Sequence, residues 1–546
     1  MIQLSKFPLF STVLKTYEQA RRYKRVLGDK VRELDETTLT GRLLAYVSHP
    51  TEQINAPKRS ESKIERIKKS IESLDTGGKA SKHHFLQTVD EQCTRELKQM
   101  STLCIFDVLH ALTKKIPNRI TESEFYERSL QELAARLPYL SKNEVIQYIF
   151  YMGLKKKNNS NNQILKKCLN KLSKSGLSTL TAEDLCVICN STFKTTTKIN
   201  DQFLSTVIAY IQNNLHLFKD PALLVTYLKS IRQNRYQNEE FLSTISYTIL
   251  FNKTAEHYSF SALCHILALY SDYLYYDENV LRHFCEKSID ILRHSSYTTK
   301  TEHMSIQSRL KDIKRLLWCL SNLNYTKLPA SDIKDVIIPS IVQRVEAGDV
   351  EENYTSLIEI ALYLWMLNYK SHELMPYFLR KTVIQPLLST NSPIKQRLNL
   401  LLTCLFYEDK TLLKESGVYP KFNSDYDMMN QLKKRPALKK VMDNLAVISK
   451  RHDLNKFQMN CQIPGLNIIG ITGYKKKIYK TAYLEILDEY TTLKNTDNSP
   501  TGPMQLKLRL LERMDEAVIL IDSNEIEGMS DKDVQRVLLE EIEFVC

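Results

Sequence analysis

Cys186 and Cys189 are the only two cysteines in the chain at the spacing of a metal or redox motif. Two thiols in a C-x-x-C arrangement bind zinc when a second Cys or His pair completes the site, and no such pair lies nearby in the sequence. The two cysteines belong to an apolar helical run, Leu-Cys-Val-Ile-Cys. We therefore expect buried thiols in a reducing compartment, and we predict neither a metal site nor a cofactor.

Basic residues recur at intervals of about 39 residues in the middle of the chain. The groups are Lys155 with Lys156 and Lys157, then Lys194 and Lys198, and then Lys229, Arg232 and Arg235. Cations in a row suit the phosphates of a single nucleic-acid strand, and Tyr151, Tyr227 and Tyr236 are candidates for stacking on bases. The alternative interpretation is that these cations offset the dipole at the ends of helices.

Net charge supports a polyanionic partner. The chain carries +13, but the segment from Glu512 to Cys546 has eleven acidic and three basic residues, so the preceding 511 residues carry +21. Such a positive body suits RNA or an anionic membrane surface. The sequence has no apolar run of about 18 residues, so we expect no membrane span.

Two sets of apolar anchors show that the elements behind the basic groups are repeats. One set is spaced by 39 residues each time and the other by 39, 38 and 39: Ile146, Leu185, Leu224 and Leu263, and Leu165, Leu204, Leu242 and Leu281. Within a unit the apolar residues follow helical spacing, and Thr181 with Asp184 has the pattern of a capping box. A hairpin of two helices buries its apolar face by stacking on its neighbours, so we predict a mostly α fold built as an α-solenoid with a period of about 39 residues.

The scarcity of glycine, 13 in 546 residues, also favours helices over strands. We expect five regions. They are an organelle-targeting segment and first helix at 1–34, a polar linker with short helices at 35–138, helical-hairpin repeats at 139–300, a further helical region at 301–460, and a small α/β domain at 461–546. Residues 1–17 are acid-poor, basic and amphipathic as in a transit peptide, but an ordinary first helix is the alternative and Pro8 weakens both.

The C-terminal region alternates strand and helix patterns. Short apolar or alternating segments at 466–471 and 474–487 indicate strands, and 504–514 has the pattern of a basic amphipathic helix. The run AVILID at 517–522 indicates a buried strand, and 531–542 indicates a closing helix. This order predicts a small α/β domain.

The order of these C-terminal segments, from PTGPMQLKLRLLERM through AVILID to VLLEEI, resembles the RAP domain. The middle segments DLCVICNSTFKTTTKI, KDPALLVTYLKSIRQNRY and RLLWCLSNLNY resemble the Fas-activated serine/threonine kinase family, whose members end in a RAP domain. The resemblance runs from about residue 140 to 543. It implies a protein of the mitochondrial matrix that binds mitochondrial transcripts and governs RNA processing, stability or translation. It also implies protein partners in RNA granules or ribosome-associated complexes.

The same resemblance implies a restriction-endonuclease-like fold for the C-terminal domain, and with it four nuclease-like residues: Glu485, Asp488, Gln505 and Lys507. Gln505 stands where such enzymes have a carboxylate, which removes a metal ligand. Asp488 as a turn residue and Lys507 on a solvated helix face are the alternatives. As RNA-contacting cations in this domain we predict Lys475, Lys476, Lys477, Lys507 and Arg509.

Kinase activity is not expected, because the chain has no G-x-G-x-x-G loop, no H-R-D and no D-F-G. We therefore predict an RNA-binding protein without enzymatic activity. The alternatives are a metal-dependent RNA endonuclease and a helical scaffold that binds proteins.

Overall fold

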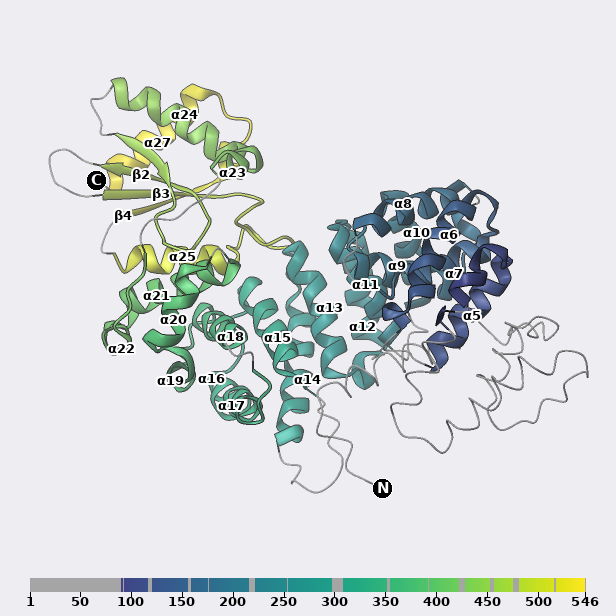
Figure 1. The fold of residues 1–546 in the computed structure, drawn as a ribbon. Helices are drawn as coiled ribbons and strands as arrows, with labels where there is room; N and C mark the ends of the chain where they lie inside the picture. The colour runs from purple at the N-terminus through teal and green to yellow at the C-terminus, as the bar shows by residue number, and fades with distance from the viewer. Residues whose placement is uncertain are drawn as a thin grey trace, which may run out of the picture. The chain divides into compact units, whose positions relative to one another are not determined.

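A computed structural model describes most of the chain from residue 90 onward. The described residues are 90–91, 93–115, 120–155, 159–174, 176–215, 221–252, 254–296, 308–350, 354–390, 392–421, 428–451, 456–474, 481–514 and 517–545. They are mostly helical, with one small sheet near the C-terminus, which confirms the predicted class at this level (Figure 1). The predicted targeting segment at 1–34 lies outside the described residues.

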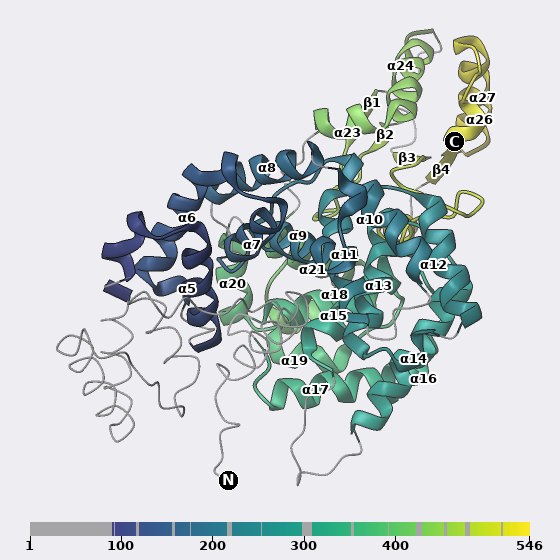
Figure 2. The same cartoon turned by 90° about the vertical axis from the view of Figure 1, so that its right-hand side faces the viewer.

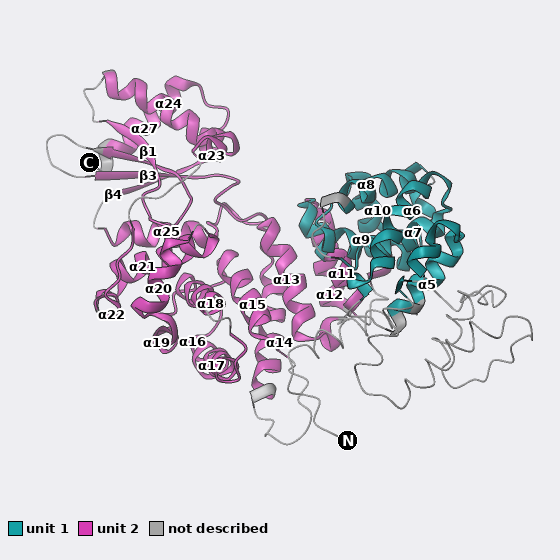
Figure 3. Cartoon of the chain, viewed as in Figure 1, with its two compact units in different colours: residues 1–213, 229–236 teal, residues 214–228, 237–546 magenta. Residues whose placement is uncertain are grey.

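The chain divides into two compact units, residues 1–213 with 229–236 and residues 214–228 with 237–546 (Figure 3). The helices of unit 1 are α5 (Thr102–Lys115), α6 (Glu124–Arg136), α7 (Lys142–Met152), α8 (Asn159–Lys174), α9 (Ala182–Thr195) and α10 (Asp201–Asn214). The last six residues of α11 (Pro221–Asn234) also belong to this unit. Helix α7 packs against α6, α8 and α9 (Figure 2).

Helices α5 and α6 lie in the range that the sequence placed in a polar linker with short helices. Both are three to four turns long and carry fully buried apolar residues, such as Leu109 in α5 and Phe125 and Leu133 in α6. Their apolar residues follow the i, i+3, i+4 spacing of a buried face, which an overall polar composition obscures. The described part of this range is therefore packed structure.

Capping boxes start the first helices of two hairpins. Thr181 and Asp184 hydrogen-bond each other's backbone N–H at 3.0 and 3.2 Å, as the sequence predicts, and Ser141 with Glu144 does the same for α7. Gly153 follows the last residue of α7, where this helix meets α9. A side chain is excluded at this position because a Cβ would lie 2.3 Å from the Oγ of Ser191. The small residue lets the two helices approach closely.

The ends of these helices repeat with the same interval as the apolar anchors. Thr196, Arg235 and Leu274 adopt left-handed backbone conformations directly after the first helix of three hairpins, at intervals of 39 residues. After Thr196 and Leu274, the next backbone N–H donates to a carbonyl five residues back, at 2.9 and 3.0 Å. Asn324 and Asn368 each lie in a Leu-Asn-Tyr sequence and end their helices in the same way.

Unit 2 begins with further helical hairpins. Its helices up to residue 416 are α12 (Glu239–Asn252), α13 (Phe260–Tyr273), α14 (Glu278–Ser296), α15 (Leu310–Asn322), α16 (Ala330–Asp332), α17 (Ile338–Glu346), α18 (Thr355–Met366), α19 (Met375–Phe378), α20 (Lys381–Ser389), α21 (Pro393–Glu408) and α22 (Lys410–Ser416). Helix α13 packs on α15, α15 on α18 and α18 on α21 (Figure 1). These four helices form the central row of the stack, and their apolar residues are nearly all buried.

The C-terminal part of unit 2 contains the sheet, with strand order β1-β2-β3-β4. The strands are β1 (Phe457–Asn460), β2 (Gly470–Tyr474), β3 (Thr481–Leu487) and β4 (Ala517–Asp522), and the helices are α23 (Met428–Lys434), α24 (Pro436–Arg451), α25 (Gly502–Glu512), α26 (Ser523–Ile526) and α27 (Asp531–Val545). The pairs β1–β2 and β2–β3 are antiparallel, whereas the pair β3–β4 is parallel. A parallel pair needs a crossover connection, and α25 supplies it.

Helices cover both faces of the sheet (Figure 1). Helices α24 and α27 share one hydrophobic core with the inward residues of β2, β3 and β4. This core includes Leu445 of α24, Leu484 of β3 and Leu538 of α27. Helix α25 covers the other face and also contacts α15, α18 and α21. The C-terminal module, as we call residues 428–545, therefore begins before residue 461, where the sequence placed its start. The four residues of β1 are too few to show a strand pattern.

None of the helices among the described residues combines the length and the apolar character needed to cross a membrane.

Candidate nucleic-acid interface

Hydrogen bonds hold the C-terminal ends of α9 and α11 side by side in unit 1. The Nε2 of Gln233 donates to the carbonyls of Thr192 and Thr197, at 3.2 and 3.3 Å. The Oδ1 of Asn234 accepts from the backbone N–H of Ile199 at 2.8 Å. The basic residues that the sequence places at these two helix ends are thereby brought to one edge.

We call Lys194, Lys198, Lys229, Arg232 and Arg235 the basic edge. Lys198 and Arg235 are exposed, and the other three are half-buried. The Nζ of Lys198 donates to the carbonyl of Gln233 at 2.5 Å, so this lysine offsets the negative end of α11 as well as pointing a charge outward. Capping and phosphate binding are compatible roles for one exposed ammonium.

Lys155, at the end of α7, differs from the basic edge because its charge is paired. Its Nζ lies 2.6 Å from the Oε2 of Glu127. The side chains are 38% and 42% exposed, so the pair is a solvated one. Lys156 and Lys157, predicted to stand beside it, lie outside the described residues.

Two of the three tyrosines proposed for base stacking are buried. Tyr151 is 2% exposed and packs against the rings of Phe106 and Phe150, while Tyr227 is fully buried. The stacking prediction is therefore wrong for both, because their places on the inner faces of α7 and α11 turn them into the core. Tyr236 is half-buried, with its hydroxyl 2.9 Å from the Oγ of Ser205, and remains a candidate.

In unit 2 the C-terminal module covers the corresponding helix ends. The backbone N–H of Lys494 donates to the carbonyl of Leu274 at 2.7 Å, and the Nδ2 of Asn324 donates to the carbonyl of Pro500 at 3.4 Å. Gly502 lies against the end of α15, where a Cβ would stand 1.6 Å from the carbonyl oxygen of Ser321. The ends of α13 and α15 are therefore occupied by residues 494–502.

Arg509 also lies in the contact between the C-terminal module and the helices of unit 2, and not on an exposed surface. Its Nε donates to the Oε1 of Glu408 at 2.8 Å, and its Nη2 donates to the carbonyl of Trp365 at 2.8 Å. The indole of Trp365 also donates to Glu408. Arg509, predicted to contact RNA, instead joins α25 to α18 and α21, where its charge is paired and 18% exposed.

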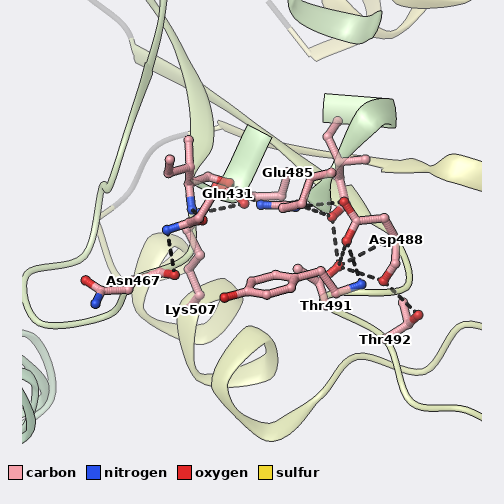
Figure 4. A network of polar contacts seen from close by, with 11 residues as sticks. Gln431, Asn467, Glu485, Asp488, Thr491, Thr492 and Lys507 are labelled. Carbon is pink, nitrogen blue, oxygen red and sulfur yellow. Dashed lines mark hydrogen bonds and ion pairs between the residues drawn. The ribbon is translucent and has the colours of Figure 1, made fainter. Parts of the chain in front are cut away.

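The structure brings three of the four nuclease-like residues into one buried region (Figure 4). The Nζ of Lys507 donates to the Oε2 of Glu485 at 2.6 Å, and both side chains are fully buried. Gln505 is half-buried on α25 and takes no part in this pair. The prediction of Lys507 as an RNA-contacting cation is wrong, because α25 lies between the sheet and the helical stack and has no solvated face at this position.

Asp488, the third of these residues, is held by Arg435, which the sequence analysis missed. The Nε of Arg435 donates to the Oδ2 of Asp488 at 2.7 Å, and its Nη2 donates to the carbonyl of Ile486 at 2.9 Å. The other carboxylate oxygen accepts from the backbone N–H of Tyr490 and the hydroxyl of Thr491, both at 3.1 Å. Asp488 therefore orders the turn after β3, as its alternative interpretation predicted.

Two further contacts complete the region shown in Figure 4. Gln431 bridges to the segment before β2, donating to the carbonyl of Asn467 and accepting from the N–H of Ile469, both at 3.0 Å. Gly470 lies so close to Glu485 that a Cβ would stand 2.1 Å from its Oε1. These contacts fix α23, β2 and β3 around the buried charges.

Burial shifts the two members of the Glu485–Lys507 pair in opposite directions. Desolvation raises the pKa of Glu485 and lowers the pKa of Lys507, while the charge of each residue opposes the shift of the other. Lys507 binds only the Oε2 of Glu485, and its Oε1 is buried without a hydrogen-bond partner among the described residues. Among the described residues, no group of three or more His, Cys, Asp or Glu side chains is arranged to hold a metal ion.

The Cys186–Cys189 pair lies within α9. Cys189 is buried, which confirms that expectation, and Cys186 is half-buried. Burial raises the pKa of the Cys189 thiol, which makes the thiolate unfavourable.

The chain matches no family model and no curated protein. Lys475, Lys476 and Lys477, the remaining cations predicted for the C-terminal module, lie outside the described residues.

Proposed function

We propose that this chain is an RNA-binding protein without enzymatic activity, whose basic edge contacts the phosphates of single-stranded RNA. The observation that carries the proposal is the alignment of Lys194 and Lys198 with Arg232 and Arg235 at two helix ends that are hydrogen-bonded to each other. Successive cations along one edge suit a flexible strand that carries one charge per nucleotide. The net charge of +13 adds long-range attraction for such a strand.

The proposal includes an α-solenoid with a period of about 39 residues. It is supported by the left-handed residues Thr196, Arg235 and Leu274 and by the starts of α9, α11 and α13 at residues 182, 221 and 260. Equal intervals at both ends of three helices are expected of stacked repeats. A strand that follows such a stack meets equivalent positions in turn.

The biological setting rests on the resemblance to the Fas-activated serine/threonine kinase family. We propose a protein of the mitochondrial matrix that binds mitochondrial transcripts and governs their processing, stability or translation, with protein partners in RNA granules or ribosome-associated complexes. The C-terminal module would then be a RAP-like domain with a restriction-endonuclease-like fold. Two antiparallel pairs, one parallel pair and a crossover helix agree with that assignment.

The salt dependence of RNA affinity tests the basic edge. We expect the triple variant Lys194→Gln, Lys198→Gln, Arg235→Gln to bind oligouridine more weakly. The slope of log K against log salt concentration should fall by about 2, because each lost phosphate contact on a single strand accounts for about 0.7. Fluorescence anisotropy over a salt series measures both quantities.

The matched control removes the same number of charges from α8 of the same unit, at the exposed Lys166, Lys167 and Lys174. We expect this control to bind oligouridine nearly as well as the unmodified protein. An edge variant that binds no more weakly than the control would contradict the proposal.

The endonuclease alternative receives no support from the geometry. Glu485 and Asp488 are both bound by internal cations, and Glu485 is fully buried. We expect purified protein with Mg²⁺ to leave a structured transcript intact. Cleavage that Asp488→Ala abolishes would reverse this conclusion.

The scaffold alternative is favoured by one observation in unit 2. Tyr247 and Phe251 on α12 are 62% and 69% exposed, and their ring centroids lie 4.5 Å apart. Exposed aromatic pairs of this kind are frequent in protein interfaces. If RNA crosslinked to the protein in cells does not exceed background, the scaffold becomes the better account.

A further inference from the structure

RNA contacts in unit 2 need a surface other than the helix ends. Residues 494–502 cover the ends of α13 and α15, and Arg509 is paired with Glu408 beside the end of α18. Lys507 is buried within the module. Exposed cations elsewhere in the described part of the module are the next candidates for phosphate contact.

Basic and acidic residues of the module lie in different segments. The segment 428–451, which forms α23 and α24, contains seven basic residues and one acidic residue. The segment 517–545, which forms β4, α26 and α27, contains eight acidic residues and two basic residues. A polyanion is attracted to the first segment and repelled by the second.

We propose that Lys433, Lys434 and Tyr490 form a second binding site for single-stranded RNA, with a phosphate at the two lysines and a base against the tyrosine ring. We call these three residues the α23 site. The inference rests on the proposed function, since it names a further contact for the same ligand.

The lysines of the α23 site are exposed at the end of α23. Neither forms an ion pair with a carboxylate among the described residues, whereas the buried cations nearby all have partners. The Nζ of Lys434 lies 5.8 Å from the centroid of the Tyr490 ring. Ammonium and ring therefore lie close enough for one nucleotide to reach both.

Tyr490 is held in place from within the module. Its backbone N–H donates to Asp488, and the guanidinium of Arg435 lies 5.9 Å from its ring centroid. Arg435 is itself fixed by Asp488 and by the carbonyls of Ile469 and Ile486. The ring is 37% exposed, so an ordered aromatic surface faces solvent beside the ammonium of Lys434. Such a surface loses little conformational entropy when a base stacks on it.

Tyr490 of the α23 site belongs to the loop that covers the helix ends. Tyr490 precedes Lys494, which is bonded to Leu274, by four residues, so their Cα atoms are at most about 14 Å apart. A strand that follows the helix ends within unit 2 meets this loop at α13. Within unit 2, Tyr490 therefore connects the exposed end of α23 with the loop that covers the end of α13.

Affinity for oligouridine tests the α23 site in the full-length protein. We expect Lys433→Gln with Lys434→Gln to weaken binding about tenfold at low salt. Tyr490→Ala should weaken it on the order of tenfold through lost stacking, whereas Tyr490→Phe should bind like the unmodified protein. The matched control, Lys450→Gln with Lys532→Gln, removes two exposed charges elsewhere in the module and should have little effect.

The outcomes separate this inference from the proposed function. If the α23 variants bind normally while the basic-edge variant is weakened, the α23 site is wrong and the proposed function stands. If the unmodified protein binds no RNA, both are wrong. If the lysine variant is weakened but Tyr490→Ala is not, the base contact is wrong. Thermal melts by circular dichroism confirm that each variant is folded, and crosslinking of thiouridine RNA to peptides around residues 433 and 490 supports the site directly.

Discussion

Lys507 was predicted to contact RNA, but its burial gives it a structural role instead. In the sequence it lies within a basic amphipathic helix, but the folded protein places it against Glu485 with both side chains fully buried. Removing one member of a buried pair leaves an uncompensated charge, while removing both is much less costly. The Glu485–Lys507 pair therefore positions α25 against β3, because only one packing of the helix on the strand brings the two charges together.

We expect Lys507→Met to lower the free energy of unfolding by about 3–5 kcal/mol, measured by urea denaturation. The double variant Glu485→Gln, Lys507→Met should recover most of the loss. Equal destabilisation in the single and double variants would contradict a specific pairing of the two charges.

The pH dependence of the same variant has a defined sign. Burial already raises the pKa of Glu485, and removing Lys507 takes away the largest opposing charge, so the pKa rises further. A carboxyl with a raised pKa in the folded state contributes stability below its unfolded value near 4.5, and this is lost as the pH rises. We expect Lys507→Met to lose stability more steeply than the unmodified protein between the mildly acidic range and pH 7. If the free energy of unfolding of Lys507→Met and of the unmodified protein changed with pH in parallel, a raised pKa of Glu485 in the variant would be contradicted.

At the scale of elements, the sequence predicts the helices well because their periodic burial is local. The capping box at Thr181 and the existence of a strand at 517–522 follow from spacing within one segment. The prediction that this strand is buried is wrong in part, because β4 lies at the edge of the sheet and Leu520 is 48% exposed. Burial of Tyr151 and Tyr227 could be anticipated only in part, since their helices are apolar on much of their surface. The strand β1 is too short to carry a pattern.

Long-range contacts were not predictable in the same way. Arg435 reaches Asp488 across 53 positions, and Lys494 reaches the end of α13 across more than two hundred. Periodicity describes one element at a time, so neither the buried network nor the covered helix ends leaves a signal in it. The role of Arg509 in joining α25 to α21 was missed for the same reason.

Gly502 tests the packing of α25 on the helical stack. A methyl group there would meet the carbonyl of Ser321, so we expect Gly502→Ala to lower the free energy of unfolding by about 3 kcal/mol. Faster limited proteolysis between α22 and β4 should accompany the loss. The neighbouring variant Pro503→Ala, at a half-buried position, is the control, and equal stability of the two would contradict the close approach.

At the scale of the whole molecule, the proposal assigns RNA to two basic surfaces, neither of which includes α27. The basic edge lies at the ends of α9 and α11, and the α23 site lies beside the loop that covers the equivalent ends in unit 2. The acidic segment from residue 517 onward repels a polyanion. If RNA binds as we propose, this charge distribution favours the basic edge and the α23 site over α27.

Crosslinking of RNA to the protein in cells, followed by mapping of the modified peptides, tests the central claim most directly. We expect RNA adducts on the peptides that carry Lys194, Lys198, Arg232 and Arg235. Recovery of RNA at background level, or adducts confined to peptides outside the basic edge and the α23 site, would contradict the account.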